Sequence, residues 1–379
     1  MSGFALVFLA AALSSCGTAI DVPIAPEAWA NPNLLVDRAR LNEIRRAAAS
    51  GHPVLAPAYA DLIRTADIMM AASPEPIHGP LEVPGFFTRE RETQRRITRR
   101  LRNDARTAHA LALACALSEN RQYGEKAREF LYAWVDNLTI PKHGGRWWHW
   151  PTPWRRGDTP IVISYSFPAF IFAFDLLRGE DILSDDEVAR FQQWLGPYVD
   201  YLGHQEFYKN NHHNWQVVFL LSAAHVLQDE ALFKRAAEYY RRGIRGQIRG
   251  DGALPRELWR RQRSGTYTLM ALEGMVQAVH IAEKHGIMLR DLQSRGGGTL
   301  EKAIDFYCDY LDDPESWARH TNARTLNTPA GTSDWGYIFE LPYRWWHNPR
   351  YLGYMQKRPY GFEVERCYTL DFATLLFAE

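Results

Sequence analysis

The chain has 379 residues, of which 46% are hydrophobic, so it is long enough to bury a large core in one domain or two. Its 44 basic residues balance 44 acidic ones, which excludes a general attraction to nucleic acid or to an anionic membrane. Its 13 Trp and 18 Tyr exceed what such a core requires, and the faces of these rings are common platforms for sugars. We therefore expect a globular protein in which a carbohydrate cleft is one use of the extra rings.

Residues 4–13 form an apolar stretch that is too short to span a bilayer and is typical of a signal peptide. The letters LSSC, which end at Cys16, resemble the bacterial lipobox, in which the cysteine becomes the lipidated first residue of the mature protein. A buried N-terminal helix is the alternative. We predict a signal segment over residues 1–16, a single catalytic domain over residues 17–379, and a location in the periplasm or, through a lipid on Cys16, at the outer membrane.

The rest of the chain has apolar residues at helical spacing and almost no strand-like alternation. The predicted helices cover residues 34–51, 56–72, 97–117, 123–138, 160–178, 185–202, 213–227, 231–248, 264–285 and 300–311. About ten to twelve helices joined by short turns predict an all-α fold, either an (α/α) toroid of helical hairpins or an α-solenoid. Because no repeat of fixed period is present, the toroid, an incomplete α/α barrel, is favoured.

Two segments between the helices are too rich in Trp, Gly and Pro to be plain connections. Residues 143–160 read HGGRWWHWPTPWRRGDTP, and such a loop on a rigid scaffold usually serves binding. Aromatic rings beside arginines suit an acidic sugar, although the rings could instead close the end of the helical ring. A second segment, residues 332–351, is predicted to face the same cleft. The substrate-binding candidates in these segments are Arg146, Trp148, Trp150 and Tyr343.

A polar cluster precedes the predicted helix over residues 213–227, in the stretch YKNNHHNW. A helix entrance needs one capping side chain, and Asn210 or Asn211 could supply it alone. The remaining polar residues, His212, His213 and Asn214, are more than the cap requires. This excess predicts a functional site at the mouth of the helix.

A third informative stretch runs from residue 250 to residue 280, where Pro255 can open a helix. Arg260, Arg263 and Tyr267 follow at positions i, i+3 and i+7, so they share one face if the segment is helical. Two guanidinium groups beside a phenol favour its anionic form, and we expect them to lower the pKa of Tyr267. The alternative is a solvated basic turn followed by a core tyrosine.

Together the two polar clusters fit cleavage of a 1,4-linked polyuronate by β-elimination. Loss of the C5 proton requires that the adjacent carboxylate be neutralised and the resulting dianion stabilised, for which amide, imidazole and guanidinium groups are suited. Asn211 and His212 would then hold the carboxylate, while Tyr267 acts as both base and acid if the C5 proton and the C4 oxygen lie on the same face of the sugar. If they lie on opposite faces, His212 would be the base and Tyr267 the acid.

The letters NNHHNW at residues 210–215, followed by RRQRSGTY at residues 260–267, resemble the alginate lyase superfamily. Its α/α-toroid members carry an Asn-Asn-His-x-x-Trp motif and a later Arg with a catalytic Tyr seven residues on, and the similarity extends over most of residues 31–350. The resemblance implies that Asn211 and His212 are the carboxylate neutraliser and the functional His. It likewise implies that Arg260 is the family's Arg and that Tyr267 is its catalytic Tyr.

The motif departs from the family's commonest form, which has a small residue and then Tyr where this chain has His213 and Asn214. These positions are expected to touch the neighbouring sugar, so the choice between alginate and glucuronan stays open. Beside the catalytic set we assign Arg263, His213 and Trp215 to substrate binding. The expected partner is an acidic polysaccharide and not nucleic acid, and membrane contact is expected only through the N-terminal anchor.

Two other classes of protein remain open. A glycoside hydrolase on the same scaffold would need paired carboxylates, for which the loop candidates are Asp158, Asp251, Glu257 and Asp334. A non-catalytic glycan-binding lipoprotein would use the aromatic rings alone.

No metal or cofactor is predicted. The spacing of His204, His212 and His213 matches no metal-binding motif. Apart from Cys16, the three cysteines Cys115, Cys308 and Cys367 allow at most one disulfide and indicate no zinc ribbon.

Overall fold

The structure is a computed structural model that describes residues 20–141, 157–203, 209–321, 332–356 and 368–379. Its α-helices are α1 (Arg38–Ala49), α2 (Leu55–Met69), α3 (Arg91–Ser118), α4 (Arg121–Asn137), α5 (Thr159–Gly179), α6 (Asp185–Gly203), α7 (Asn211–Leu227), α8 (Glu230–Ile244), α9 (Pro255–Leu258), α10 (Ser264–Lys284), α11 (Leu300–Asp312), α12 (Pro314–Thr321), α13 (Glu340–Trp346), α14 (Pro349–Met355) and α15 (Ala373–Phe377). Short 3-10 helices are η1 (Pro26–Trp29), η4 (Arg261–Arg263) and η5 (Thr332–Phe339), and the strands found in these residues are β1 (Gly79–Pro80) and β2 (Leu138–Thr139), which pair in parallel.

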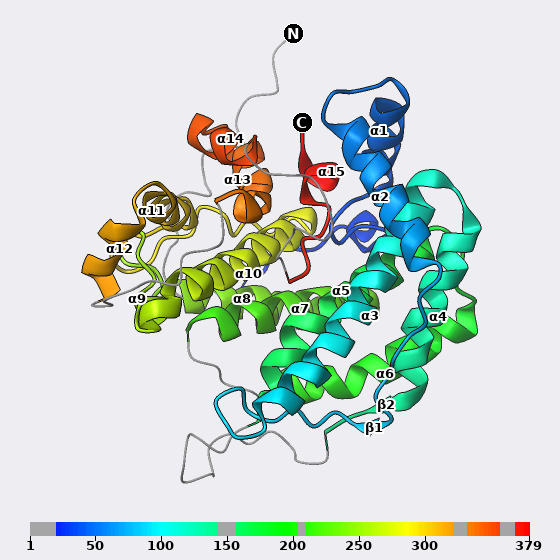
Figure 1. Cartoon of the computed structure of the whole chain (residues 1–379). Coiled ribbons are helices and arrows are strands. Elements are labelled where there is room, and N and C mark those ends of the chain that lie inside the picture. Colours follow the sequence, from blue (N-terminus) through cyan, green and yellow to red (C-terminus); the bar gives the residue numbers. More distant parts are fainter. Residues whose placement is uncertain (1–19, 142–156, 204–208, 322–331, 357–367) are drawn as a thin grey trace.

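The helices form two layers of successive hairpins (Figure 1). In one layer α3 packs on α5, α5 on α7, and α7 on α10. The helices of the other layer pack against this one. Helix α4 contacts α3, both α6 and α8 contact α7, and α11 contacts α10. This arrangement is an α/α toroid, so the all-α prediction is confirmed.

The central helices are apolar on all sides, which is the pattern of helices in the core of a large domain. Every residue of α5 from Thr159 to Leu177 is buried, and so is nearly all of α7. In the part of the chain that the structure describes, α5 is also the one helix that is long and apolar enough to cross a membrane. Its complete burial by neighbouring helices explains that composition as a core helix.

The ten predicted helices correspond to observed ones, with two informative differences. Helix α3 begins at Arg91, well before the predicted start at residue 97. The prediction began too late because the first turns of the helix are polar and carry no apolar periodicity. The helix expected to continue from Pro255 is interrupted between α9 and α10. Here Arg261 has a φ of 51°, in the left-handed region, so Arg260 and Tyr267 do not share one continuous helix.

A buried polar network fixes the segment before α1 to the toroid. The Asp175 carboxylate on α5 accepts hydrogen bonds from the backbone N–H groups of Asn33, at 3.0 Å, and Leu34, at 2.9 Å. It also lies 3.2 Å from Nε2 of His225 on α7, whose Nδ1 is 2.9 Å from Nε2 of His285 at the end of α10. The N-terminal segment therefore connects three inner helices.

The C-terminal segment is held in a similar way. Glu273, buried within α10, accepts hydrogen bonds from the backbone N–H groups of Tyr368, at 2.7 Å, and Thr369, at 3.0 Å. Arg106 on α3 donates to Asp371, with Nε at 2.8 Å from Oδ2. These contacts tie the Tyr368 backbone to α10, and its ring packs against those of Tyr165 on α5 and Trp215 on α7.

Candidate active site

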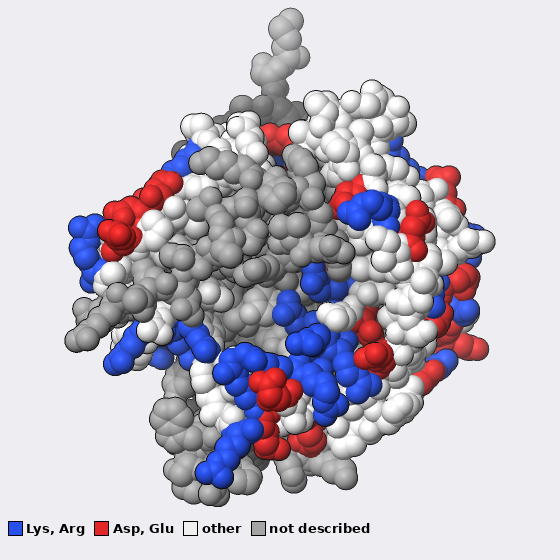
Figure 2. All heavy atoms as spheres, viewed as in Figure 1, with Lys and Arg blue, Asp and Glu red and all other residues white. Residues whose placement is uncertain are grey.

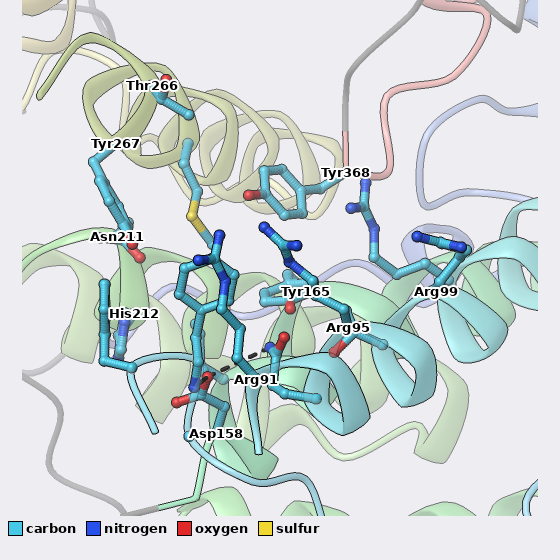
Figure 3. A pocket seen from close by; sticks show the side chains of 18 of the residues that line it. Arg91, Arg95, Arg99, Asp158, Tyr165, Asn211, His212, Thr266, Tyr267 and Tyr368 are labelled. Carbon is cyan, nitrogen blue, oxygen red and sulfur yellow. Dashed lines mark hydrogen bonds between the residues drawn. The ribbon is translucent and has the colours of Figure 1, made fainter. Parts of the chain in front are cut away.

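A cleft of about 870 Å³ opens where the inner helices meet the segments just described. Its walls come from the loop before α3, the N-terminal part of α3, the first turns of α5 and α7, the region from η4 to the start of α10, and Tyr368. Figure 3 shows Arg91, Arg95 and Arg99 entering from α3, Asn211 and His212 from α7, and Thr266 and Tyr267 from α10. The segments are distant in sequence, so only the folded toroid assembles the cleft.

The described lining of this cleft is strongly cationic. Its arginines are Arg91, Arg95, Arg99, Arg102 and Arg106 from α3, together with Arg260 and Arg263. Among the lining residues that the structure describes, Asp158 carries the only carboxylate. Figure 2 shows basic side chains gathered over the N-terminal part of α3. A chain with no net charge thus concentrates positive charge in one place, as binding of a polyanion requires.

The five arginines of α3 stand at i, i+4, i+8, i+11 and i+15, which places them on one helix face. The guanidinium of Arg91 lies 4.5 Å from the ring centroid of Phe86, and that of Arg102 lies 4.5 Å from the ring of Tyr368. Such cation–π contacts fix the direction of the guanidinium groups while leaving their charge available. Apolar periodicity does not reveal this row, although the spacing of the arginines in RETQRRITRRLRNDAR, residues 91–106, contains it.

At the mouth of α7, one asparagine caps the helix and the next lies in the cleft. The Asn210 side chain accepts a hydrogen bond from the backbone N–H of His212, at 3.2 Å. Asn211 is fully buried and lines the cleft, and its Nδ2 donates to both carboxylate oxygens of Glu257, at 3.0 and 3.1 Å. The cap therefore accounts for Asn210 alone, and Asn211 is available for another role.

His212 lines the same cleft. Burial, supported by the nearby positive charge of Arg260, lowers its pKa to about 3. The imidazole is therefore neutral throughout the physiological range and is a weaker base than an exposed histidine.

Tyr267 lies in the cleft with the guanidinium of Arg260 at 4.6 Å from its ring centroid. Burial raises the pKa of Tyr267, although Arg260 and Arg263 act in the opposite direction. The expectation of a lowered pKa was therefore wrong, because the desolvation of the phenolate exceeds the effect of the two charges. Arg263 packs against Phe86 and Phe87, with its guanidinium 5.4 and 5.6 Å from their ring centroids.

Three residues predicted to bind substrate lie elsewhere. Trp215 is fully buried and donates from Nε1 to the Met270 carbonyl at 3.0 Å, and the ring of His213 packs 4.1 Å from that of Tyr239. Successive residues of a helix point about 100° apart, so His213 turns away from the cleft that His212 lines. Tyr343 packs against His347 and does not line the cleft, so the expectation that residues 332–351 face the cleft fails for it.

The departure from the family motif also lies away from the cleft lining. Asn214 is fully buried and donates from Nδ2 to the Ala271 carbonyl at 3.1 Å. Neither it nor His213 is placed to touch a sugar, contrary to expectation. Arg146, Trp148 and Trp150 lie outside the described residues, as does His204.

The carboxylates considered for hydrolysis do not form a pair in the described lining. Asp158 lines the cleft, accepts from the Phe86 N–H at 2.8 Å, and has its pKa raised by burial to about 6. Glu257 is fully buried behind Asn211, and Asp251 is exposed and paired with Arg249. The Asp334 side chain is not among those described.

Within the described residues, no three His, Cys, Asp or Glu side chains are grouped so as to hold a metal ion. Cys115 and Cys308 are free, buried thiols. Burial raises the pKa of Cys115 to about 11, so its thiol is unreactive at neutral pH.

Fold and cleft together define an α/α-toroid protein with a cationic cleft suited to an anionic polymer. The chain belongs to the alginate lyase family, whose sequence model, described as "Alginate lyase", matches residues 84–317. It is 30% identical to an alginate lyase of Pseudomonas syringae pv. tomato over 115 residues, and this stretch covers 30% of this chain and 29% of that protein. It is 25% identical over 173 residues to a polysaccharide lyase of Stenotrophomonas maltophilia, which covers 45% of this chain and 50% of that protein.

Solved structures show the same fold over nearly the whole chain. An alginate lyase from Bacteroides ovatus aligns with a TM-score of 0.73 at 19% identity, covering 92% of this chain and 100% of that one. Alginate lyase A1-III from Sphingomonas species A1 aligns with a TM-score of 0.70 at 18% identity, covering 94% and 100%. A variant of A1-III complexed with a tetrasaccharide aligns with a TM-score of 0.69 at 17% identity, covering 94% and 98%.

Proposed function

We propose that the protein is a polysaccharide lyase that cleaves a 1,4-linked polyuronate, either alginate rich in mannuronate or glucuronan, by β-elimination. The observation that carries this proposal is that Asn211, His212, Arg260 and Tyr267 line one cationic cleft. Membership of the alginate lyase family and the tetrasaccharide bound by a structural relative support it. A single acidic residue in the described lining argues against hydrolysis by paired carboxylates.

The first chemical requirement is stabilisation of charge. Removal of the C5 proton leaves a dianion spread over C5 and the carboxylate, so the transition state carries more negative charge than the bound sugar. Arg260, fixed over the ring of Tyr267, presents a permanent positive charge within the cleft. The arginines of α3 hold the carboxylates of neighbouring sugars and keep the chain in register.

The second requirement is proton transfer. Elimination breaks the C5–H bond and the bond from C4 to its oxygen, forms a C4–C5 double bond, and returns a proton to the leaving oxygen. Tyr267 is protonated at rest because burial raises its pKa, and Arg260 opposes this by favouring the phenolate. Tyr267 serves as base and then as acid when both groups lie on one face of the sugar. With groups on opposite faces, neutral His212 takes the C5 proton and Tyr267 protonates the oxygen.

The test is incubation with polymannuronate, polyguluronate, glucuronan and pectate while absorbance near about 235 nm is followed, since elimination creates an unsaturated product and hydrolysis does not. Replacing Tyr267 with Phe should lower kcat by at least about 100-fold while binding is retained. The matched control is Tyr343→Phe, which removes a phenol that does not line the cleft. Unchanged turnover in the Tyr267 variant, or no absorbance change with any polyuronate, would refute the proposal.

We also propose that the protein acts in the bacterial envelope, either in the periplasm or tethered to the outer membrane through a lipid on Cys16. Mass spectrometry of the mature N-terminus checks this location. Recovery of the protein in the cytoplasmic fraction with an unprocessed Met1 would contradict it.

A further inference from the structure

The amide of Asn211 is held by a buried acid that the proposed reaction does not use. Glu257 is fully buried. Its Oε1 accepts the backbone N–H of Asn211 at 2.6 Å, and both of its oxygens accept from Asn211 Nδ2, at 3.0 and 3.1 Å. An ionised carboxylate can only accept hydrogen bonds, so it draws the amide NH₂ group towards itself.

In this orientation the amide oxygen of Asn211, and not its NH₂ group, is left to contact an anionic substrate. The amide Oδ1 is buried and has no hydrogen-bond partner among the described residues, so it is the group left to meet a ligand. A uronate carboxylate is also an acceptor and cannot bond to a carbonyl oxygen. With Glu257 ionised, Asn211 would repel the carboxylate that it is expected to neutralise.

Protonation of Glu257 removes the conflict. One oxygen continues to accept the backbone N–H of Asn211, while the other, now an O–H group, donates to Asn211 Oδ1. The side-chain amide then turns over, and its Nδ2 becomes available to a ligand in the cleft. Every polar atom of the pair has a partner in this state, as buried groups require.

We propose that Glu257 is a positioning residue, and that substrate binding adds a proton from water to Glu257 and turns the Asn211 amide so that Nδ2 donates to the uronate carboxylate. The inference rests on the function proposed above. It makes the affinity for substrate depend on pH through a group that never touches the sugar.

The surroundings of Glu257 are suited to this exchange. Burial raises its pKa to about 7, although the hydrogen bonds from Asn211 and the charges of Arg260 and Arg256 act in the opposite direction. From α10, Tyr267 senses the charge of Glu257, and from α7, His212 is neutral and adds none. A bound carboxylate brings another negative charge and raises the pKa of Glu257 further, which favours proton uptake.

The protonation of Glu257 determines how KM changes with pH. Below about pH 7 Glu257 is already protonated, so binding requires no proton and KM is constant. Above that pH each binding event must take up one proton, and KM should rise about tenfold per pH unit. An ordinary structural role for Glu257 would not produce this slope.

Glu257→Gln tests the inference, because the Gln amide donates to Asn211 Oδ1 and accepts the Asn211 N–H at every pH. For the polyuronate that the wild type cleaves, KM should be flat from about pH 6 to about pH 9. At about pH 9 it should be at least about tenfold below the wild-type KM. The Leu side chain of Glu257→Leu cannot donate to Asn211 Oδ1, so the KM of this variant should exceed that of Glu257→Gln at all pH values. The control Glu301→Gln replaces a carboxyl outside the cleft and should keep the wild-type profile.

A second measurement does not depend on the Glu257 variants folding. Calorimetric titration of Tyr267→Phe with the same polyuronate, in two buffers of different ionisation enthalpy, should show about one proton taken up per site near pH 8. Elimination with a wild-type KM that is independent of pH, or binding without proton uptake, overturns the inference and leaves the proposed function intact. Absence of both binding and elimination overturns the proposed function instead.

Discussion

At the level of single residues, two opposed effects act on the pKa of Tyr267. Its burial raises the pKa of the phenol, while Arg260, 4.6 Å from the ring centroid, favours the phenolate. A catalytic acid must hold a proton at rest and a base must be able to lose it, so this opposition suits a residue that does both. Arg260 also contributes to the low pKa of His212, which links the two proton-carrying groups through one charge.

Replacing Arg260 with Ala should therefore lower kcat by about 100-fold to 1,000-fold, the usual cost of removing one preorganised group that stabilises transition-state charge. Because Arg260 lowers the pKa of Tyr267, its loss should also move the alkaline limb of the kcat profile to higher pH. The measurement is kcat against pH for the wild type and the variant.

The control is Arg261→Ala, which removes the next arginine along the chain, an exposed side chain that does not line the cleft. It should behave like the wild type. If Arg260→Ala lost turnover without any displacement of the alkaline limb, Tyr267 would not be the acid whose pKa Arg260 lowers.

At the level of elements, α3 has two different parts. From Leu111 to Leu117 every residue is buried against other helices, whereas the first turns present arginines to the cleft. Arg99 is exposed and has no ion-pair partner among the described residues. It is therefore available to a polyanion without breaking an existing contact.

Replacing Arg99 with Ala should raise KM by about fivefold and leave kcat nearly unchanged, because one solvated charge pair contributes about 1 kcal/mol and lies away from the reacting atoms. Raising the NaCl concentration to about 0.5 M should largely abolish the difference, since such pairs are screened. Arg46→Ala on α1 removes an exposed arginine outside the cleft and should change neither constant. A loss of kcat in the Arg99 variant with KM intact would contradict a role in binding.

The elements were the most predictable part of the molecule. Apolar periodicity predicted ten helices, because burial selects apolar residues at every turn. The break at Arg261 was not predictable, since a left-handed residue that is not Gly leaves no signal in the letters. Trp215 and His213 were placed wrongly because sequence adjacency to His212 says nothing about which side of α7 faces the cleft.

At the level of the whole molecule, the candidate site draws on segments that only tertiary packing brings together. Phe86, Tyr165 and Tyr368 line the cleft but carry no local motif. Tyr368 is there because Glu273 binds its backbone N–H, a contact between residues 95 positions apart. The sequence motifs could therefore indicate Asn211, His212, Arg260 and Tyr267 as one site, but not the walls around them.

The N-terminal segment depends on one buried carboxylate in the same way. Asp175 accepts the backbone N–H groups of Asn33 and Leu34 and lies beside His225, and its exposed fraction is 2%. Asp175→Ala would leave these donors buried without an acceptor. The free energy of unfolding should fall by about 3 kcal/mol or more, measured by urea denaturation followed by circular dichroism.

Asp200→Ala on α6 is the matched control, because Asp200 is exposed and its loss should change the free energy of unfolding by no more than about 0.5 kcal/mol. Limited proteolysis adds a local measurement, since the chain before α1 should be cut first in the Asp175 variant. Equal unfolding curves for the two variants would mean that other contacts hold the segment. In that case water entering the network would be satisfying the donors that Asp175 now binds.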